Sequence, residues 1–151
     1  MANLAGKVEA EVEIKCDADE FFHSWGGKAH QLPNLCSEKL HNVEVHEGDW
    51  KTESSVKLWT YVHEGKVETF KERLKIDEEN KLITADGIEG DPMKLYNVFK
   101  VSLQIIPKGQ SSFVKWSIDY EKINEDVPDP TSYLDWLVNS GKLADESLLK
   151  T

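Results

Sequence analysis

Apolar and polar residues alternate one by one over most of this chain, and the pattern becomes helical only near the end. Over 8–15, small or branched apolar side chains alternate with charged ones, which is typical of a half-buried strand. Six further strands are predicted, separated by short polar turns, at 40–46, 53–63, 66–76, 81–88, 95–106 and 112–122. Short turns between successive strands indicate antiparallel neighbours.

The last segment, 129–149, predicts one long amphipathic helix. Asp129 can cap its first turn, and Pro130 suits the first helical position. Residues three and four positions apart form its apolar stripe: Tyr133, Trp136, Leu137, Ser140, Leu143, Ala144 and Leu148. Gly141 lies inside this helix, so Ser140 and Gly141 mark either a bend that lets one wall move or a tolerated surface glycine.

Two short helical segments are predicted after the first strand. Asp17 offers an N-cap to the first, which should end at Gly26. The second covers 28–35 as a short helix or turn, and Pro33 is expected to disturb it.

The resulting order is one strand, two short helices, six strands and a long helix. This order predicts a single α+β domain over 1–151, in which the long helix lies across a concave sheet. Side chains need not fill the space between the two, so an internal ligand cavity is one hypothesis. The stripe alone is more typical of an ordinary packed core, because apolar helix faces are usually core.

Alternation assigns inward faces to the strands. Val56, Leu58, Thr60 and Val62 are placed inward on one strand, and Phe70, Glu72 and Leu74 on the next. The inward residues of the last two strands are Phe99, Val101, Leu103 and Ile105, then Val114, Trp116, Ile118 and Tyr120. Together with the helix stripe, these faces predict the following cavity lining: Phe22, Leu58, Phe70, Glu72, Phe99, Val101, Trp116, Tyr133, Trp136, Leu137 and Ser140. Glu72 is the exception, either a solvated rim residue or a polar point inside a wet cavity.

Composition narrows the classes of function. The formal net charge is −10 over 151 residues and Arg73 is the one arginine, which argues against nonspecific nucleic-acid binding and against adsorption to anionic membranes. No apolar run is long enough for stable membrane insertion. The N-terminus has no signal-peptide pattern, and two cysteines, Cys16 and Cys36, form no disulfide framework. A cytoplasmic protein, with a monomer favoured, is therefore expected.

Catalytic and metal-binding patterns are not evident. The five histidines show no zinc spacing, so no metal and no cofactor are predicted. His46 and His63 end strands beside glutamates and are interpreted as surface pairs. No nucleophile–base pair is visible in the sequence.

The chain resembles the plant major latex-like proteins over its whole length. The resemblance rests on His46-Glu47-Gly48-Asp49-Trp50, on Ser55-Val56-Lys57-Leu58-Trp59-Thr60-Tyr61-Val62-His63-Glu64-Gly65-Lys66, on Gly87-Ile88-Glu89-Gly90-Asp91-Pro92 and on Leu4-Ala5-Gly6-Lys7. These proteins belong to the superfamily of the birch pollen allergen and the class-10 pathogenesis-related proteins. The resemblance implies a helix-grip fold: a seven-stranded antiparallel sheet with two short helices around a long C-terminal helix. It also implies a large cavity for hydrophobic or amphipathic molecules, which favours the cavity over the packed core.

Ribonuclease activity, proposed for the pathogenesis-related branch, does not carry over. Lys57 matches the lysine of that proposal, but Tyr96, Asn97 and Val98 stand where its acid is expected. The loop over 46–52 has one glycine and two acids, which would repel a phosphate.

Two functions remain. The first is a carrier for a small hydrophobic or amphipathic plant ligand, such as a lipid, lysophospholipid or steroid, linked to defence or stress. The alternative is an enzyme that acts on a plant secondary metabolite in the same cavity, with Glu72, His23 or His30 as acid or base.

Overall fold

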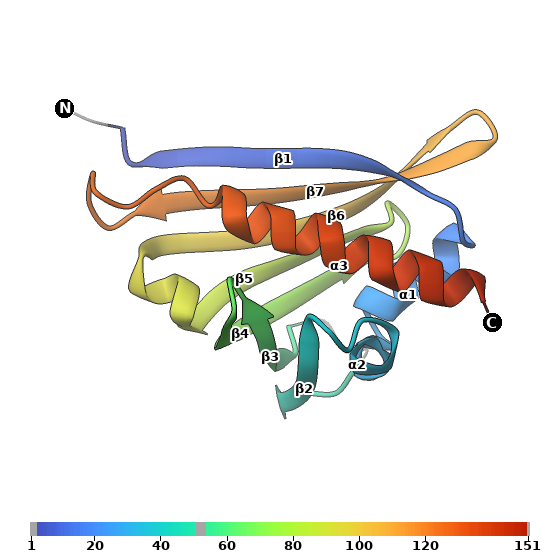
Figure 1. The fold of residues 1–151 in the computed structure, drawn as a ribbon, viewed down its shortest axis with the longest axis horizontal. Helices are drawn as coiled ribbons and strands as arrows, with labels where there is room; N and C mark the ends of the chain where they lie inside the picture. The colour runs from blue at the N-terminus through green and yellow to red at the C-terminus, as the bar shows by residue number, and fades with distance from the viewer. Residues whose placement is uncertain (1–2, 51–53, 151) are drawn as a thin grey trace.

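The computed structural model describes residues 3–50 and 54–150 and contains one seven-stranded antiparallel sheet (Figure 1). Its strand order is β1-β7-β6-β5-β4-β3-β2. Each strand from β2 to β6 therefore pairs with the next one along the chain, and β1 forms the other edge of the sheet beside β7. The strands are β1 (Ala5–Ile14), β2 (Leu40–Glu47), β3 (Val56–His63), β4 (Lys66–Asp77), β5 (Leu82–Gly90), β6 (Tyr96–Lys108) and β7 (Ser111–Lys122). The predicted number of strands and their antiparallel pairing are confirmed.

The long helix α3 (Thr131–Leu149) lies across one face of this sheet (Figure 1). Two short helices, α1 (Ala18–Trp25) and α2 (Leu32–Leu35), contact it and cover the space near its C-terminal end. Short 3₁₀ turns precede α2 (η1, Ala29–Gln31) and β6 (η2, Asp91–Lys94). This arrangement is the predicted helix-grip fold. No helix among the described residues is long and apolar enough to cross a membrane.

The predicted start of α3 and the predicted effect of Pro33 on α2 are wrong. Pro130 is the N-cap of α3 and not its first helical residue, and no side chain caps this end. The Asp129 carboxylate is held elsewhere, because it accepts from the Tyr120 hydroxyl at 2.9 Å and pairs with Lys122 at 2.8 Å. Pro33 does not disturb α2, because it lies in the first turn, where a missing N–H costs nothing. Asp17 does cap α1, accepting from the Asp19 amide.

The predicted inward face of β3 is also wrong. Trp59 lies directly opposite Phe70 on β4, and Lys57 lies opposite Glu72. Directly opposed residues share a face of the sheet. Phe70 and Glu72 are buried as predicted, so the odd-numbered residues of β3 face the interior, and Leu58 faces outward beside Lys71.

The predicted inward faces of the other strands are confirmed. Phe70 and Leu74 on β4, and Leu103 and Ile105 on β6, are buried. On β7 the predicted inward residues Val114, Trp116, Ile118 and Tyr120 are all buried, as is Ser117 between them. Lys51, Thr52 and Glu53, which belong to the predicted loop and strand start, lie outside the described residues.

Gly141 is buried in the middle of α3, so the interpretation as a surface glycine is wrong. A Cβ at this position would lie 3.0 Å from Cζ2 of Trp116, whose ring is part of the core. Glycine therefore lets the helix approach the sheet closely at this point. The helix runs unbroken through Ser140 and Gly141.

We expect Gly141→Ala to destabilise the protein by about 1 kcal/mol, whereas the same change in an exposed helix stabilises by about that amount. The added methyl group must displace the Trp116 ring or lift the helix, and overpacking of this kind typically costs about 1–3 kcal/mol. Urea unfolding of both proteins measures the difference. A gain of about 1 kcal/mol in Gly141→Ala would show that the contact with Trp116 is not restrictive.

Candidate ligand-binding site

A cavity of about 90 Å³ lies between the sheet and the first half of α3. It has room for several water molecules or for one small ring. The resemblance implied a large cavity, and this one is modest. Its wall consists of Trp25, Trp59, Tyr61, Phe70, Glu72, Leu74, Ile83, Ala85, Pro92, Phe99, Val101, Leu103, Trp116, Ile118, Tyr133, Trp136 and Leu137.

Eight of the eleven predicted lining residues form part of this wall. They come from β4, β6, β7 and α3: Phe70, Glu72, Phe99, Val101, Trp116, Tyr133, Trp136 and Leu137. The residues that alternation places on the inward faces of these strands thus meet the apolar stripe of α3, as the sequence indicates. The interior is not packed solid beneath the helix.

Three predicted lining residues lie elsewhere. Leu58 faces outward on β3. Phe22 is fully buried on α1, but its ring lies beside His23 and beneath the Lys81 amine, outside the cavity wall. Ser140 is buried in the half of α3 where Gly141 brings the helix against Trp116, and the cavity ends before it.

Sequence reasoning missed the two aromatic residues that β3 contributes, Trp59 and Tyr61. Trp25 of α1 was missed as well, and its indole stacks on Trp59 with ring centroids 6.2 Å apart. Trp136 of α3 contacts the same strand, because its indole N–H donates to the Val62 carbonyl at 2.7 Å and its ring packs against Tyr61. Aromatic side chains therefore form much of the wall.

Glu72 is the polar point of the cavity, so its interpretation as a solvated rim residue is wrong. Its side chain is buried, with 4% of the residue exposed, and Oε1 accepts from the Trp59 indole N–H at 2.5 Å. Burial raises the pKa of Glu72 to about 7, although the Trp59 hydrogen bond and the charge of Lys57 oppose the rise. Near neutral pH this carboxyl group can therefore be a hydrogen-bond donor or an acceptor.

Lys57 lies directly opposite Glu72 on the neighbouring strand β3 and is fully buried. Its amine donates to the carbonyls of Gly26 at 3.3 Å and Trp50 at 3.1 Å. Burial lowers the pKa of Lys57, and the charges of Glu72 and Asp49 act in the opposite direction. A lysine enclosed in this way is not available to the phosphates of RNA, which agrees with the absence of the ribonuclease pattern.

Two indole N–H groups in the cavity wall residues have no hydrogen-bond partner within the described part of the chain. They belong to Trp25 and Trp116, whose rings meet edge to face at 5.0 Å. A buried donor without an acceptor is costly. Nε1 of Trp116 lies against Gly141 of α3, beyond the end of the cavity.

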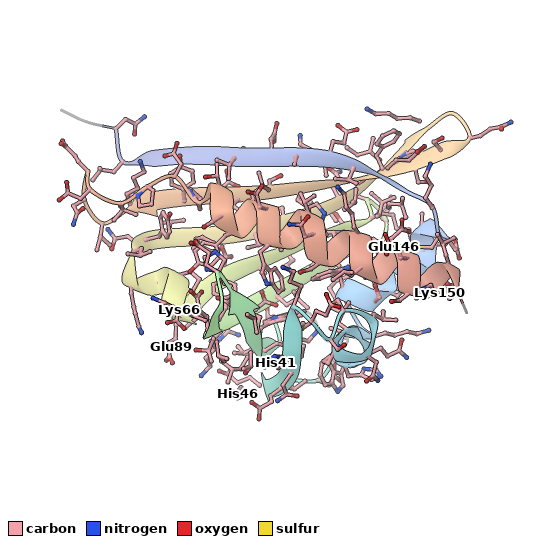
Figure 2. The ribbon with its side chains drawn as sticks, in the orientation of Figure 1. His41, His46, Lys66, Glu89, Glu146 and Lys150 are labelled. Atoms are coloured by element: carbon pink, nitrogen blue, oxygen red, sulfur yellow. The ribbon has the colours of Figure 1, made fainter. Side chains whose placement is uncertain are left out.

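The histidines proposed for catalysis lie outside the cavity wall. His23 pairs with Glu78 at 3.4 Å, and His30 packs against Trp50. His41 and His46 are exposed on β2, at the edge of the molecule (Figure 2). His63 is different: only 6% of it is exposed, which corrects its interpretation as part of a surface pair.

Among residues 3–50 and 54–150, no cluster of three or more histidine, cysteine, aspartate or glutamate side chains could hold a metal ion. Cys16 and Cys36 are free thiols.

Comparison with known proteins identifies relatives along the whole described chain. The chain is 41% identical to MLP-like protein 43 of Arabidopsis thaliana over 151 residues, which is 98% of this chain and 96% of that protein. It is 42% identical to MLP-like protein 28 of the same plant, of which it spans only 45%. The crystal structure of ginseng major latex-like protein 151 from Panax ginseng superposes with a TM-score of 0.94 at 36% identity, covering 97% of this chain and 99% of that one.

A more distant structural neighbour is the norcoclaurine synthase from Thalictrum flavum. It has a TM-score of 0.74 at 23% identity, and the alignment covers 97% of this chain and 88% of that one. A likeness at this level shows a shared fold. Residues 3–151 match the Pathogenesis-related protein Bet v 1 family as a whole. The chain therefore belongs to the Bet v 1 family, with major latex proteins and MLP-like proteins among its close homologues.

Proposed function

We propose that this protein binds and carries a small hydrophobic or amphipathic molecule in the cavity beneath α3. The observation that carries the proposal is the cavity itself: an aromatic and aliphatic enclosure with a single carboxyl group, Glu72, in its wall. Ligand sites of this kind are concave, mostly apolar and contain a few placed polar groups. The pathogenesis-related description of the family supports a role linked to defence or stress. The free thiols of Cys16 and Cys36 support a reducing, cytoplasmic location.

The size and polarity of the cavity narrow the ligand class. A volume of about 90 Å³ suits one ring or a short chain, so a steroid or a lysophospholipid would require α3 to move outward. The carboxyl group of Glu72, which can donate or accept a hydrogen bond near neutral pH, favours a ligand with a hydroxyl, carbonyl or ether oxygen. We infer a small, mainly apolar compound with one such oxygen.

Apolar burial should supply most of the binding energy. Each buried methylene contributes about 0.8 kcal/mol before the cost of ordering the ligand is subtracted. The net charge of −10 and the enclosed position of Lys57 leave no exposed cationic anchor in the cavity wall as described. Binding of an uncharged ligand should therefore not depend on salt.

Trp136→Ala is expected to weaken the binding of anisole, an uncharged single-ring ether used as a probe, by about 1–3 kcal/mol, because the indole forms one side of the cavity. Fluorescence titrations at low and high ionic strength measure the affinity, and the wild-type value should be the same at both.

Trp50→Ala is the matched control, since Trp50 lies outside the cavity wall, and thermal unfolding shows whether each variant is folded. A tenfold loss of affinity at high salt, with Trp136→Ala neutral, would instead locate the probe at a charged surface site.

The second candidate is an enzyme that uses the same cavity, and Glu72 is the observation in its favour. A buried carboxyl group with a pKa raised to about 7 can act as a general acid or base near neutral pH. Norcoclaurine synthase shares the fold. Incubating small phenolic amines and aldehydes with the protein and with Glu72→Gln tests this candidate, since turnover that needs Glu72 would favour it over a carrier.

A further inference from the structure

Three side chains that are distant in the sequence form a hydrogen-bonded chain at the start of α3. The Ser132 hydroxyl lies 3.0 Å from Nε2 of His63, and Nδ1 of His63 lies 3.1 Å from Oε2 of Glu68. His63 ends β3, Glu68 lies on β4 just past a two-residue turn, and Ser132 lies in the first turn of α3. None of the three belongs to the cavity wall.

Glu68 is held firmly enough to orient the imidazole. Its other oxygen, Oε1, accepts from the Tyr133 hydroxyl at 2.8 Å and from the Tyr61 hydroxyl at 3.2 Å. The His63 ring also stacks on Tyr133, with centroids 3.9 Å apart and planes 11° apart. A carboxylate oxygen accepts from the Nδ1 proton, which leaves the lone pair of Nε2 directed at Ser132. Glu64 also faces Nε2, with its Oε1 at 3.5 Å.

We propose that Ser132, His63 and Glu68 form a nucleophilic triad that cleaves small uncharged esters. Both distances lie within the range for a nucleophile, its base and the acid that orients the base. The same three roles are filled by serine, histidine and an acidic residue on several unrelated folds. The proposed activity is additional to ligand binding in the cavity and does not require it.

The reaction balances with water as the second substrate. The Ser132 oxygen attacks the ester carbonyl carbon and His63 takes the hydroxyl proton at Nε2. The bond to the alcohol oxygen then breaks, and His63 returns the proton to that oxygen, which leaves an acyl group on Ser132. A water molecule, deprotonated by His63, then attacks the acyl carbon. The bond between that carbon and the Ser132 oxygen breaks, His63 returns the proton to this oxygen, and the carboxylic acid leaves.

The first turn of α3 can stabilise the negative charge that develops on the carbonyl oxygen. Within the described residues, the amides of Ser132 and Tyr133 donate to no protein acceptor, as expected for the start of a helix. One is the amide of the nucleophile itself and the other follows it directly. Backbone N–H groups in such positions commonly serve as oxyanion donors.

The surroundings favour an ester with an apolar group. Tyr61 and Tyr133 hold Glu68 and are also part of the cavity wall, so the triad lies directly beside apolar surface. Glu64 and the net charge of −10 disfavour an anionic substrate.

p-Nitrophenyl butyrate and a biotinylated alkyl fluorophosphonate test the proposal on the whole chain of 151 residues. We expect hydrolysis above the background rate, and we expect mass spectrometry of a tryptic digest to locate the fluorophosphonate on Ser132. Ser132→Ala should lower the rate at least roughly a hundredfold, towards that of buffer, and should remove the label. Thr131→Ala is the matched control, because this neighbouring hydroxyl is exposed and contacts no histidine in the structure described.

Glu68→Gln separates a catalytic arrangement from a structural one, because glutamine keeps the shape of the side chain. As Glu68 is a positioning residue, its replacement should lower kcat at least roughly tenfold while leaving KM unchanged. Thermal unfolding verifies that each variant is folded. An equal rate in Ser132→Ala and wild type, or labelling that persists in Ser132→Ala, would overturn the proposal and leave the three residues as a clasp between β3, β4 and α3.

Discussion

Glu72→Gln is expected to stabilise the protein by about 3 kcal/mol above pH 8 and to leave its stability nearly unchanged at pH 4. The carboxyl group is enclosed in the cavity wall, and its pKa rises from 4.5 to about 7 on folding. Such a rise corresponds to about 3 kcal/mol of preference for the neutral form in the fold. Glutamine has the same shape, remains neutral at every pH and can accept from the Trp59 indole.

The sign of the pH dependence follows from the raised pKa. Below the unfolded value near 4.5, Glu72 is neutral in both states and adds no penalty. As pH rises towards and beyond about 7, the unfolded chain releases a proton that the folded protein holds, so wild-type stability falls.

Urea unfolding at pH 4 and pH 8.5 measures this difference, with Glu89→Gln as control because Glu89 is exposed on β5 (Figure 2). If the free energy of unfolding differs by the same amount between wild type and Glu72→Gln at both pH values, Glu72 is solvated in the fold.

Ala85→Leu is expected to lower the affinity for the anisole probe roughly tenfold to a hundredfold without unfolding the protein. Ala85 contributes the smallest side chain of the cavity wall, from the middle of β5. Three additional carbon atoms would occupy much of the 90 Å³ and displace a ring-sized ligand.

Thr84→Leu is the matched control, because Thr84 is the adjacent residue on β5 and points to the other face of the sheet. It should bind the probe as the wild type does, and thermal unfolding of both variants detects any overpacking. Unchanged affinity in Ala85→Leu would place the probe outside the cavity.

Most of the fold could be predicted because alternation along a strand and the helical stripe are local properties. The faces of β4, β6 and β7 follow from alternating apolar residues, and they meet Tyr133, Trp136 and Leu137 of α3 at the predicted side. The volume of the cavity depends on how side chains interlock across the interior, which no local pattern encodes.

The inverted face of β3 had a detectable signal. Glu64 and Gly65 form a two-residue turn with positive φ at both positions, which pairs His63 with Lys66. That register places Trp59 opposite Phe70, so an inward Phe70 requires an inward Trp59. Placing the aliphatic residues of β3 inward was therefore inconsistent with the inward face already assigned to β4.

The cost of burying polar groups explains why the sequence pattern of β3 favours the wrong inward face. An inward Lys57 and His63 look unfavourable in a sequence because their partners are not visible there. In the fold, Lys57 bonds to two backbone carbonyls and His63 to Glu68 and Ser132. Two of these partners, Gly26 and Ser132, are distant in sequence, so only the tertiary structure brings them together.

The central claim is that a small apolar ligand occupies the cavity beneath α3, and the five tryptophan indole N–H signals test it most directly. Four of the five indoles line the cavity: Trp25, Trp59, Trp116 and Trp136. Trp50 lies outside it, against His30. A ¹⁵N–¹H NMR titration with the anisole probe should shift the four cavity signals together along one binding curve and leave the Trp50 signal unchanged. A shift confined to Trp50, or none in the four cavity signals at saturating probe, would contradict the account.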